Sequence, residues 1–121
     1  MSRPTIAIVE DEFLLALELE SLCQDLGYEV LGTARSATDA QERFGTLKPD
    51  ILVTDMELGN RLDGVDVVDV LREQNPSLEV VFVTGTQAPE KIQRMRAVSP
   101  KKILSKPVRS EELRLALGGI S

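Results

Sequence analysis

Short apolar runs alternate with helical patterns five times along this chain. Residues at helical spacing follow each run, beginning with Leu15, Leu19, Leu22 and Leu26 after the first. The five runs, each bounded by polar or turn-forming residues, are Thr5–Val9, Glu29–Ala34, Asp50–Asp55, Val80–Val83 and Ile103–Leu104. Alternation of this kind with short connections is typical of parallel βα units. The pattern therefore predicts an α/β protein with a five-stranded parallel sheet.

The order of the strands follows from the rules for parallel sheets. Right-handed crossovers with helices on both faces favour the flavodoxin-like, doubly wound order 2-1-3-4-5. The first and third strands are then neighbours, and the ligand site lies between their carboxyl ends. The third run predicts a strand that is buried on both faces and ends at Asp55.

Two helices have patterns that guide later interpretation. The fourth, predicted from about Pro89 to Val98, has only Ile92, Met95 and Val98 as apolar anchors. In the third, Val67, Val68 and Leu71 predict the inward face. Asp63, Asp66 and Asp69, which are spaced by three, predict a solvated face.

Composition limits the class of protein. The 121 residues, 42% of them hydrophobic, suffice for one domain, so we expect residues 1–121 to form a single domain. A net charge of −6 argues against nucleic-acid binding and favours protein partners. The chain has no signal peptide pattern and no apolar run of about 18 residues, so we expect a cytoplasmic protein without membrane contact. Cys23 is expected in the core, because no histidine is present to form a Cys/His site with it.

Candidate chemistry gathers at the predicted carboxyl ends of the strands. In the order 2-1-3-4-5, Glu10 and Asp11 lie beside Asp55, while Thr84 and Lys106 follow the fourth and fifth runs. Three converging carboxylates repel one another unless a proton or cation joins them. Oxygen ligands with an open edge favour a hard cation, and Mg²⁺ fits best.

Bound Mg²⁺ commonly adds a phosphoryl oxygen to its carboxylate ligands, so the predicted site can receive phosphate next to Asp55. A carboxylate can itself be the nucleophile and form an aspartyl phosphate. Lys106 and Thr84 would then hold the phosphoryl oxygens. Each motif alone has a simpler interpretation, such as a turn or a favourable charge at a helix start, but their joint placement favours a site.

Four short motifs resemble those of receiver domains in bacterial two-component response regulators, the CheY-like superfamily. They are Val9-Glu10-Asp11-Glu12, Ile51-Leu52-Val53-Thr54-Asp55, Val83-Thr84-Gly85 and Ser105-Lys106-Pro107, and the likeness covers essentially the whole chain. The resemblance implies a phosphorylation switch. Because no DNA-binding or catalytic output segment follows the last helix, we expect a single-domain receiver that signals by protein contact, unless the chain is a fragment of a longer protein. The resemblance also implies a cis peptide bond before Pro107.

The resemblance assigns roles to these residues. It implies that Asp55 accepts a phosphoryl group from a histidine kinase or phosphotransfer protein and loses it slowly by autodephosphorylation. Asp11 would bind Mg²⁺ directly, Glu10 through water, and Glu57 through its backbone carbonyl. Thr84 would be the switch hydroxyl and Lys106 the phosphate-pairing lysine. A protein that catalyses only its own phosphorylation and dephosphorylation is not an enzyme in the usual sense.

One departure from the family affects how a signal would leave the domain. Ile103 occupies the place where the family usually has Tyr or Phe, so switching by rotation of an aromatic ring cannot occur. We expect a downstream protein to bind the Thr86–Val98 segment, Ile103 and the last helix. Gln87, Arg94 and Arg96 would face that partner. A second departure is the acidic Glu57, two residues after Asp55, which could change how fast water attacks the acyl phosphate.

Two other classes of protein share parts of this pattern. A pseudo-receiver would be a docking module with the same fold and no phosphoryl chemistry, but the complete acceptor set argues against it. A small phosphatase of the haloacid dehalogenase type also uses Asp, Thr or Ser, Lys and Mg²⁺. In this chain the acidic pair precedes Asp55 and no cap encloses a substrate, which argues against that class.

Overall fold

The computed structural model describes residues 3–59 and 61–118, and its elements alternate as the sequence predicts. The strands are β1 (Thr5–Val9), β2 (Glu29–Ala34), β3 (Ile51–Thr54), β4 (Glu79–Thr84) and β5 (Lys102–Ser105). The helices are α1 (Phe13–Asp25), α2 (Ala37–Phe44), α3 (Gly64–Gln74), α4 (Pro89–Arg96) and α5 (Ser110–Gly118). The peptide bond between Lys106 and Pro107 is cis. None of the helices in this part of the chain has the length and apolar character needed to cross a bilayer.

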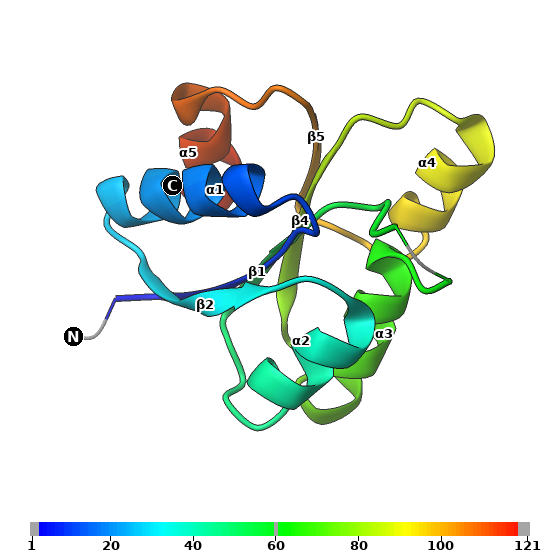
Figure 1. Ribbon diagram of the computed structural model, residues 1–121, viewed down its shortest axis with the longest axis horizontal. Helices are drawn as coiled ribbons and strands as arrows, with labels where there is room; N and C mark the ends of the chain where they lie inside the picture. Colours follow the sequence, from blue (N-terminus) through cyan, green and yellow to red (C-terminus); the bar gives the residue numbers. More distant parts are fainter. Residues whose placement is uncertain (1–2, 60, 119–121) are drawn as a thin grey trace.

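The sheet has the predicted order, β2-β1-β3-β4-β5, and every pair of neighbouring strands is parallel. Helices α1 and α5 cover one face, and α2, α3 and α4 cover the other (Figure 1). This is the doubly wound, flavodoxin-like architecture. The carboxyl ends of β1 and β3 are therefore neighbours at one edge of the sheet.

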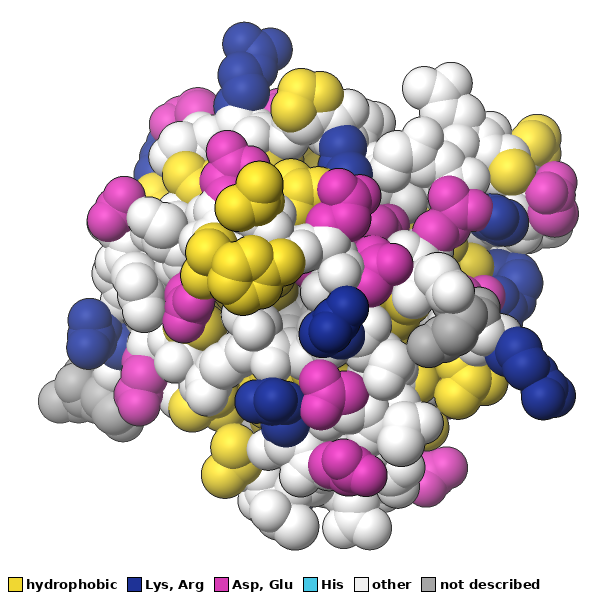
Figure 2. Space-filling model, in the orientation of Figure 1, with side chains coloured by type: hydrophobic (Ala, Val, Ile, Leu, Met, Phe, Trp, Pro, Cys, Tyr) yellow, Lys and Arg dark blue, Asp and Glu magenta, His cyan; other side chains and the backbone are white. Residues whose placement is uncertain are grey.

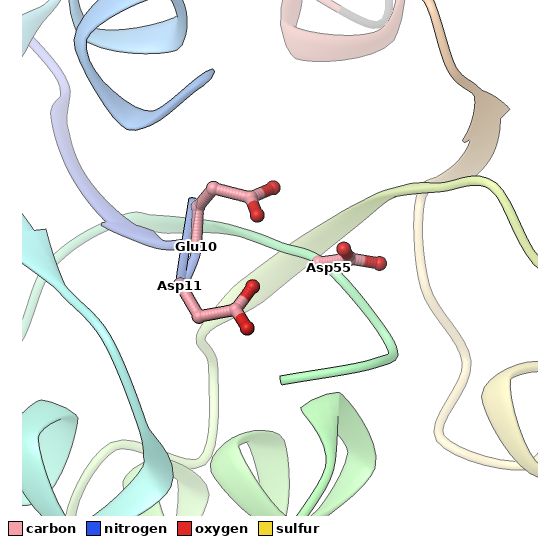
Figure 3. A group of neighbouring side chains, drawn as sticks. All are labelled: Glu10, Asp11 and Asp55. Atoms are coloured by element: carbon pink, nitrogen blue, oxygen red, sulfur yellow. The ribbon is translucent and has the colours of Figure 1, made fainter. Parts of the chain in front are cut away.

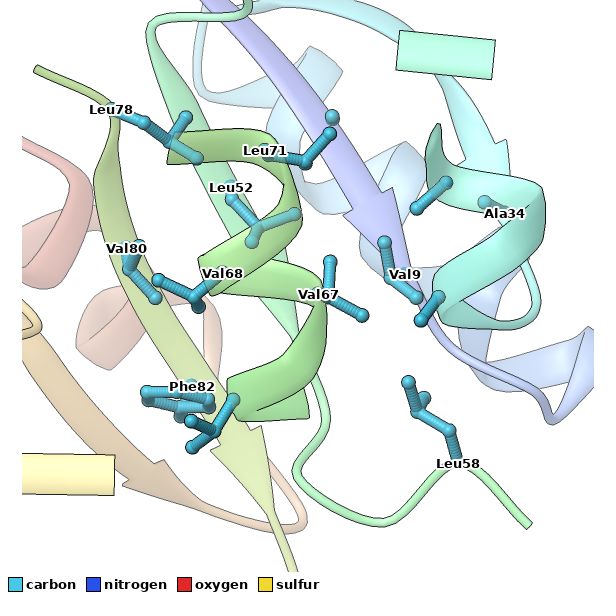
Figure 4. Close-up of a cluster of buried hydrophobic side chains, with 14 of the residues drawn as sticks. Val9, Ala34, Leu52, Leu58, Val67, Val68, Leu71, Leu78, Val80 and Phe82 are labelled. Atoms are coloured by element: carbon cyan, nitrogen blue, oxygen red, sulfur yellow. The ribbon is translucent and has the colours of Figure 1, made fainter. Parts of the chain in front are cut away.

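Alternation along the strands divides the core into two clusters. Ala7 and Val9 of β1 point toward α2 and α3, whereas Ile6 and Ile8 join the cluster beneath α1 and α5. Figure 4 shows α3 laid over β3 and β4, with Val67, Val68 and Leu71 turned toward the sheet as predicted. Full burial of such a side chain contributes roughly 1.5–3 kcal/mol. The aliphatic core thus holds the strand ends in place.

Helix α1 turns the predicted face toward the core: Leu19 is buried, and Leu22 and Leu26 pack partly against the core. Its other buried residues are Ala16 and Cys23. Burial raises the pKa of the Cys23 thiol to about 12, which agrees with a role in the core. Phe13 (73% exposed) and Leu14 (77% exposed) face solvent at the start of this helix.

The start of α3 corrects the interpretation of its three aspartates. Asp63 is the N-cap, and its carboxylate accepts the backbone N–H of Asp66 at 3.1 Å. The Asp66 carboxylate accepts the backbone N–H of Asp63 at 2.8 Å, which completes a capping box. Of the three, only Asp69 is exposed along the helix as predicted.

Helix α4 combines sparse apolar anchoring with ion pairs, and Ile92 packs partly against the core as predicted. Met95 is its one buried residue, as the sparse anchoring predicts. Lys91 forms an ion pair with Glu57, and Arg94 forms one with Asp63. The pairing of Arg94 with Asp63 at the start of α3 was not foreseen, and the expectation that Arg94 faces a partner stays a prediction.

Gly64 allows the chain to turn closely past the end of β3. A Cβ atom at this position would lie 2.2 Å from the Asp55 carbonyl oxygen. Gly64→Ala should therefore lower the free energy of unfolding by roughly 1–3 kcal/mol, as overpacking does, in urea denaturation. Gly118→Ala, where a Cβ would meet nothing within 4 Å, is the control. Equal stability of the two variants would contradict the close approach.

Candidate functional site

Three carboxylates meet where β1 and β3 end. Val9 pairs with Thr54 in the parallel ladder, and the Asp55 N–H donates to the Val9 carbonyl at 3.1 Å. Glu10 and Asp11 follow β1, so they lie beside Asp55, as predicted. One carboxylate oxygen from each of the three lies within 4.8 Å of the other two. Figure 3 shows Glu10 and Asp11 extending from the end of β1 on the side where Asp55 lies.

Lys106 closes this cluster from the end of β5. Its Nζ lies 2.7 Å from Asp55 Oδ2 and 3.1 Å from Glu10 Oε1. Both partners are buried, with Glu10 1% and Asp55 6% exposed. The other oxygen of each carboxylate accepts a backbone N–H at 3.2 Å, from Glu57 at Asp55 and from Glu12 at Glu10. The acceptor side chain is thus held at both oxygens.

Burial and pairing shift the pKa values of two of these groups upward. At Glu10, burial raises the pKa, and the Glu12 N–H and the Lys106 ammonium only partly offset it. At Lys106, burial lowers the pKa, but hydrogen bonds to Asp55 and Glu10 outweigh it, so the pKa is raised overall. The ammonium therefore stays charged near neutral pH, whereas the Glu10 carboxylate is the less stabilised partner of this pair.

This cluster fits a small, hard cation. Apart from its ion-pair contact with Lys106, the buried Glu10 Oε1 has no hydrogen-bond partner in the described part of the chain. The Lys106 ammonium offsets part of the cost of burying this oxygen, and a bound cation would offset more of it. With only oxygen donors in the cluster, Mg²⁺ suits the donor set.

Thr84 stands at the end of β4, next to Lys106. It is 3% exposed, and its hydroxyl accepts the Thr86 N–H at 3.3 Å. The Thr84 carbonyl accepts the Lys106 N–H at 3.0 Å, which ties the two strand ends together. The ends of β1, β3, β4 and β5 therefore bring the candidate residues Glu10, Asp11, Asp55, Thr84 and Lys106 to the same edge of the sheet.

Two further residues shape the site without having been singled out from the sequence. The Thr54 hydroxyl donates to the Asp55 carbonyl at 2.9 Å. Gly59 has φ +74°, and a Cβ there would lie 2.7 Å from Asp11 Oδ2. Glycine thus lets this loop approach the Asp11 carboxylate. The glycine-bearing loop after β3 is the only sequence signal of this contact.

Comparison with known proteins identifies the family. The model of the response regulator receiver domain matches residues 6–118. The chain belongs to this family, whose members are signalling modules of two-component systems.

Relatives share the domain over different fractions of their length. PhyR of Methylorubrum extorquens is 33% identical over 103 residues, which span 84% of this chain and 38% of PhyR. PdtaR of Mycobacterium tuberculosis is 27% identical over 108 residues, spanning 89% of this chain and 52% of PdtaR. CheY of Thermotoga maritima is 23% identical over 96% of both chains.

Solved structures of receiver domains have the same fold as this chain. The signal receiver domain of a modulated diguanylate cyclase from Desulfovibrio desulfuricans is 34% identical, with a TM-score of 0.87 and coverage of 96% of this chain and 91% of that one. The receiver domain of PhyR from Erythrobacter litoralis is 30% identical, with a TM-score of 0.83 and coverage of 97% and 88%.

Asp11→Asn should weaken Mg²⁺ binding by about tenfold, because a hard cation loses one of very few anionic ligands. Isothermal titration calorimetry measures the affinity. Glu12→Gln removes the same charge from the neighbouring exposed position and is the matched control. If both variants lose affinity equally, Asp11 acts only through long-range charge and not as a ligand.

Proposed function

We propose that this receiver domain is a phosphorylation switch in which Asp55 accepts a phosphoryl group from a histidine kinase or phosphotransfer protein. The observation that supports this most is the position of Lys106 Nζ, 2.7 Å from Asp55 Oδ2, beside a cluster of three carboxylates. This arrangement combines a carboxylate nucleophile, an ammonium group that can pair with a phosphoryl oxygen, and ligands for a cation. Residues 1–121 would act as one domain.

The transfer is a direct displacement at phosphorus. A carboxylate oxygen of Asp55 forms the new P–O bond while the P–N bond of phosphohistidine breaks, and the imidazole keeps the electron pair and takes up a proton. Mg²⁺, held by Glu10, Asp11, Asp55 and the Glu57 carbonyl, would neutralise charge on the phosphoryl oxygens. Slow attack by water on the phosphorus of the acyl phosphate would reset the switch.

Residues of this chain prepare the acceptor for that step. The Glu57 N–H orients Asp55 through Oδ1, and Lys106 orients it through Oδ2. Lys106 can stay paired with the transferred group, because its flexible ammonium lies in contact with the acceptor. The Thr84 hydroxyl, now bonded to the Thr86 N–H, is free to donate to a phosphoryl oxygen.

Two exposed surfaces suit protein partners. Phe13, Leu14 and Leu17 lie exposed at the start of α1, and Figure 2 shows hydrophobic side chains there next to a group of acidic ones. An apolar surface beside the acceptor suits a phosphodonor protein. On α4, a depression of about 420 Å³ includes Gln87 and Arg96, which supports the Thr86–Val98 segment as a surface for a downstream protein.

Incubation with Mg²⁺ and acetyl phosphate should add one phosphoryl group to the wild-type protein and none to Asp55→Asn, as read by intact-protein mass spectrometry. The amide lacks the nucleophilic oxygen charge that the displacement requires. Asp69→Asn, an exposed acid on α3, should be phosphorylated like wild type. An undiminished mass shift in Asp55→Asn would exclude Asp55 as the acceptor. No shift in wild type would favour a docking module without phosphoryl chemistry.

Thr84→Val should permit phosphorylation of Asp55 but uncouple it from the segment Thr86–Val98. A ligand shifts an equilibrium only through its different contacts with the two states, and the valine variant removes the hydroxyl contact. Hydrogen exchange with and without beryllofluoride, a phosphoryl mimic, measures the protection of that segment. Thr38→Val, on the exposed side of α2, is the control. The same change in protection in all three proteins would show that coupling does not pass through Thr84.

A further inference from the structure

Glu57 connects the acceptor to α4 through two different groups. Its backbone N–H donates to Asp55 Oδ1 at 3.2 Å, so its peptide unit faces the acceptor. Its carboxylate, 51% exposed, is paired with the ammonium group of Lys91 in the first turn of α4. The Glu57 side chain therefore points toward α4, while its backbone N–H faces Asp55.

Charged residues of both signs surround this pair. Glu57 and Lys91 line a depression of about 350 Å³ next to the acceptor loop, together with Asp63 and Arg61. Asp63 forms an ion pair with Arg94. Among the described residues, the ion pair of the Glu57 carboxylate is with Lys91. Without Lys91, the Glu57 carboxylate loses the contact that holds it at α4 and can turn back toward the acceptor loop.

We propose that Lys91 is a positioning residue for phosphoryl transfer: it holds and neutralises the Glu57 carboxylate, so that an anionic phosphodonor reaches Asp55 without repulsion from this fourth acid. This inference rests on the function proposed above. It extends that function to Lys91 on α4. The ion pair of Lys91 is with Glu57, and not with Asp55 or with the carboxylates of Glu10 and Asp11.

The size of the effect follows from Coulomb's law in a solvated site. A unit charge several ångströms from a phosphoryl group, in a medium close to water, changes a rate by about two- to fivefold. The effect must shrink at high salt, because both groups of the pair are solvent-exposed. The effect must also be larger for acetyl phosphate than for phosphoramidate, which carries less negative charge.

The test compares initial rates of Asp55 phosphorylation by acetyl phosphate at low salt. In this reaction the Asp55 oxygen bonds to phosphorus as the bond from phosphorus to the acetate oxygen breaks, and acetate leaves with that electron pair. Lys91→Ala should slow the reaction about two- to fivefold. Lys91→Arg should restore most of the rate. Lys102→Ala, which removes the same charge from an exposed residue at the start of β5, should match wild type.

A double-mutant comparison tests whether Lys91 acts through Glu57. Adding Lys91→Ala to a Glu57→Gln protein should cause less slowing than in wild type, because no carboxylate remains for Lys91 to hold away from the acceptor. A second readout uses metal-free protein: Lys91→Ala and Glu57→Gln should each speed amide hydrogen exchange at the start of α4, and the double variant no more than either.

The outcomes separate this inference from the proposed function. If wild type takes up no phosphoryl group, the proposed function fails and the inference falls with it. If wild type is phosphorylated and Lys91→Ala behaves like Lys102→Ala, the inference alone is overturned. Equal slowing by Lys91→Ala in the wild-type and Glu57→Gln backgrounds would also overturn it, because Lys91 would then act on the donor directly.

Discussion

The parallel pairing of β1 with β3 is the constraint on which the site depends. The ladder bond from the Asp55 N–H to the Val9 carbonyl makes Glu10 and Asp55 the first residues beyond two adjacent strands. Two buried carboxylates at such a place repel each other, and the Lys106 ammonium lies between them. Lys106 is in turn held by its N–H bond to the Thr84 carbonyl. The sheet thus brings together charged groups. Burial of each alone would be unfavourable, but together they stabilise one another.

The fold and the centre of the site could be predicted from the sequence because each depends on strong local signals. Aliphatic runs that end at turn residues located the strands to within one residue at each end. Once right-handed crossovers set the strand order, Glu10, Asp11, Asp55 and Lys106 had to share one edge. The inner face of α1 was predicted apart from Ala16, a small residue that gives a weak pattern.

Contacts between side chains distant in sequence were beyond prediction. Thirty-one residues separate Arg94 from Asp63 and 34 separate Lys91 from Glu57, and no periodicity reports which charged groups meet over such distances. The spacing of Asp63 and Asp66 suits a capping box as well as a solvated face, and the choice depends on where the helix begins. The approach of Gly59 to Asp11 depends on loop geometry in the same way.

The way α4 is attached has a thermal consequence. Helix α4 buries one apolar side chain fully, Met95, and packs Ile92 partly against the core, so its release would expose less hydrocarbon to water than unfolding of the aliphatic core. The change in heat capacity on such a local opening is small, because it scales with the apolar surface that becomes exposed. The balance between attached and detached α4 therefore curves little with temperature, unlike the unfolding of the aliphatic core. If this segment switches as proposed, its set point would shift less with temperature than the stability of the rest of the domain.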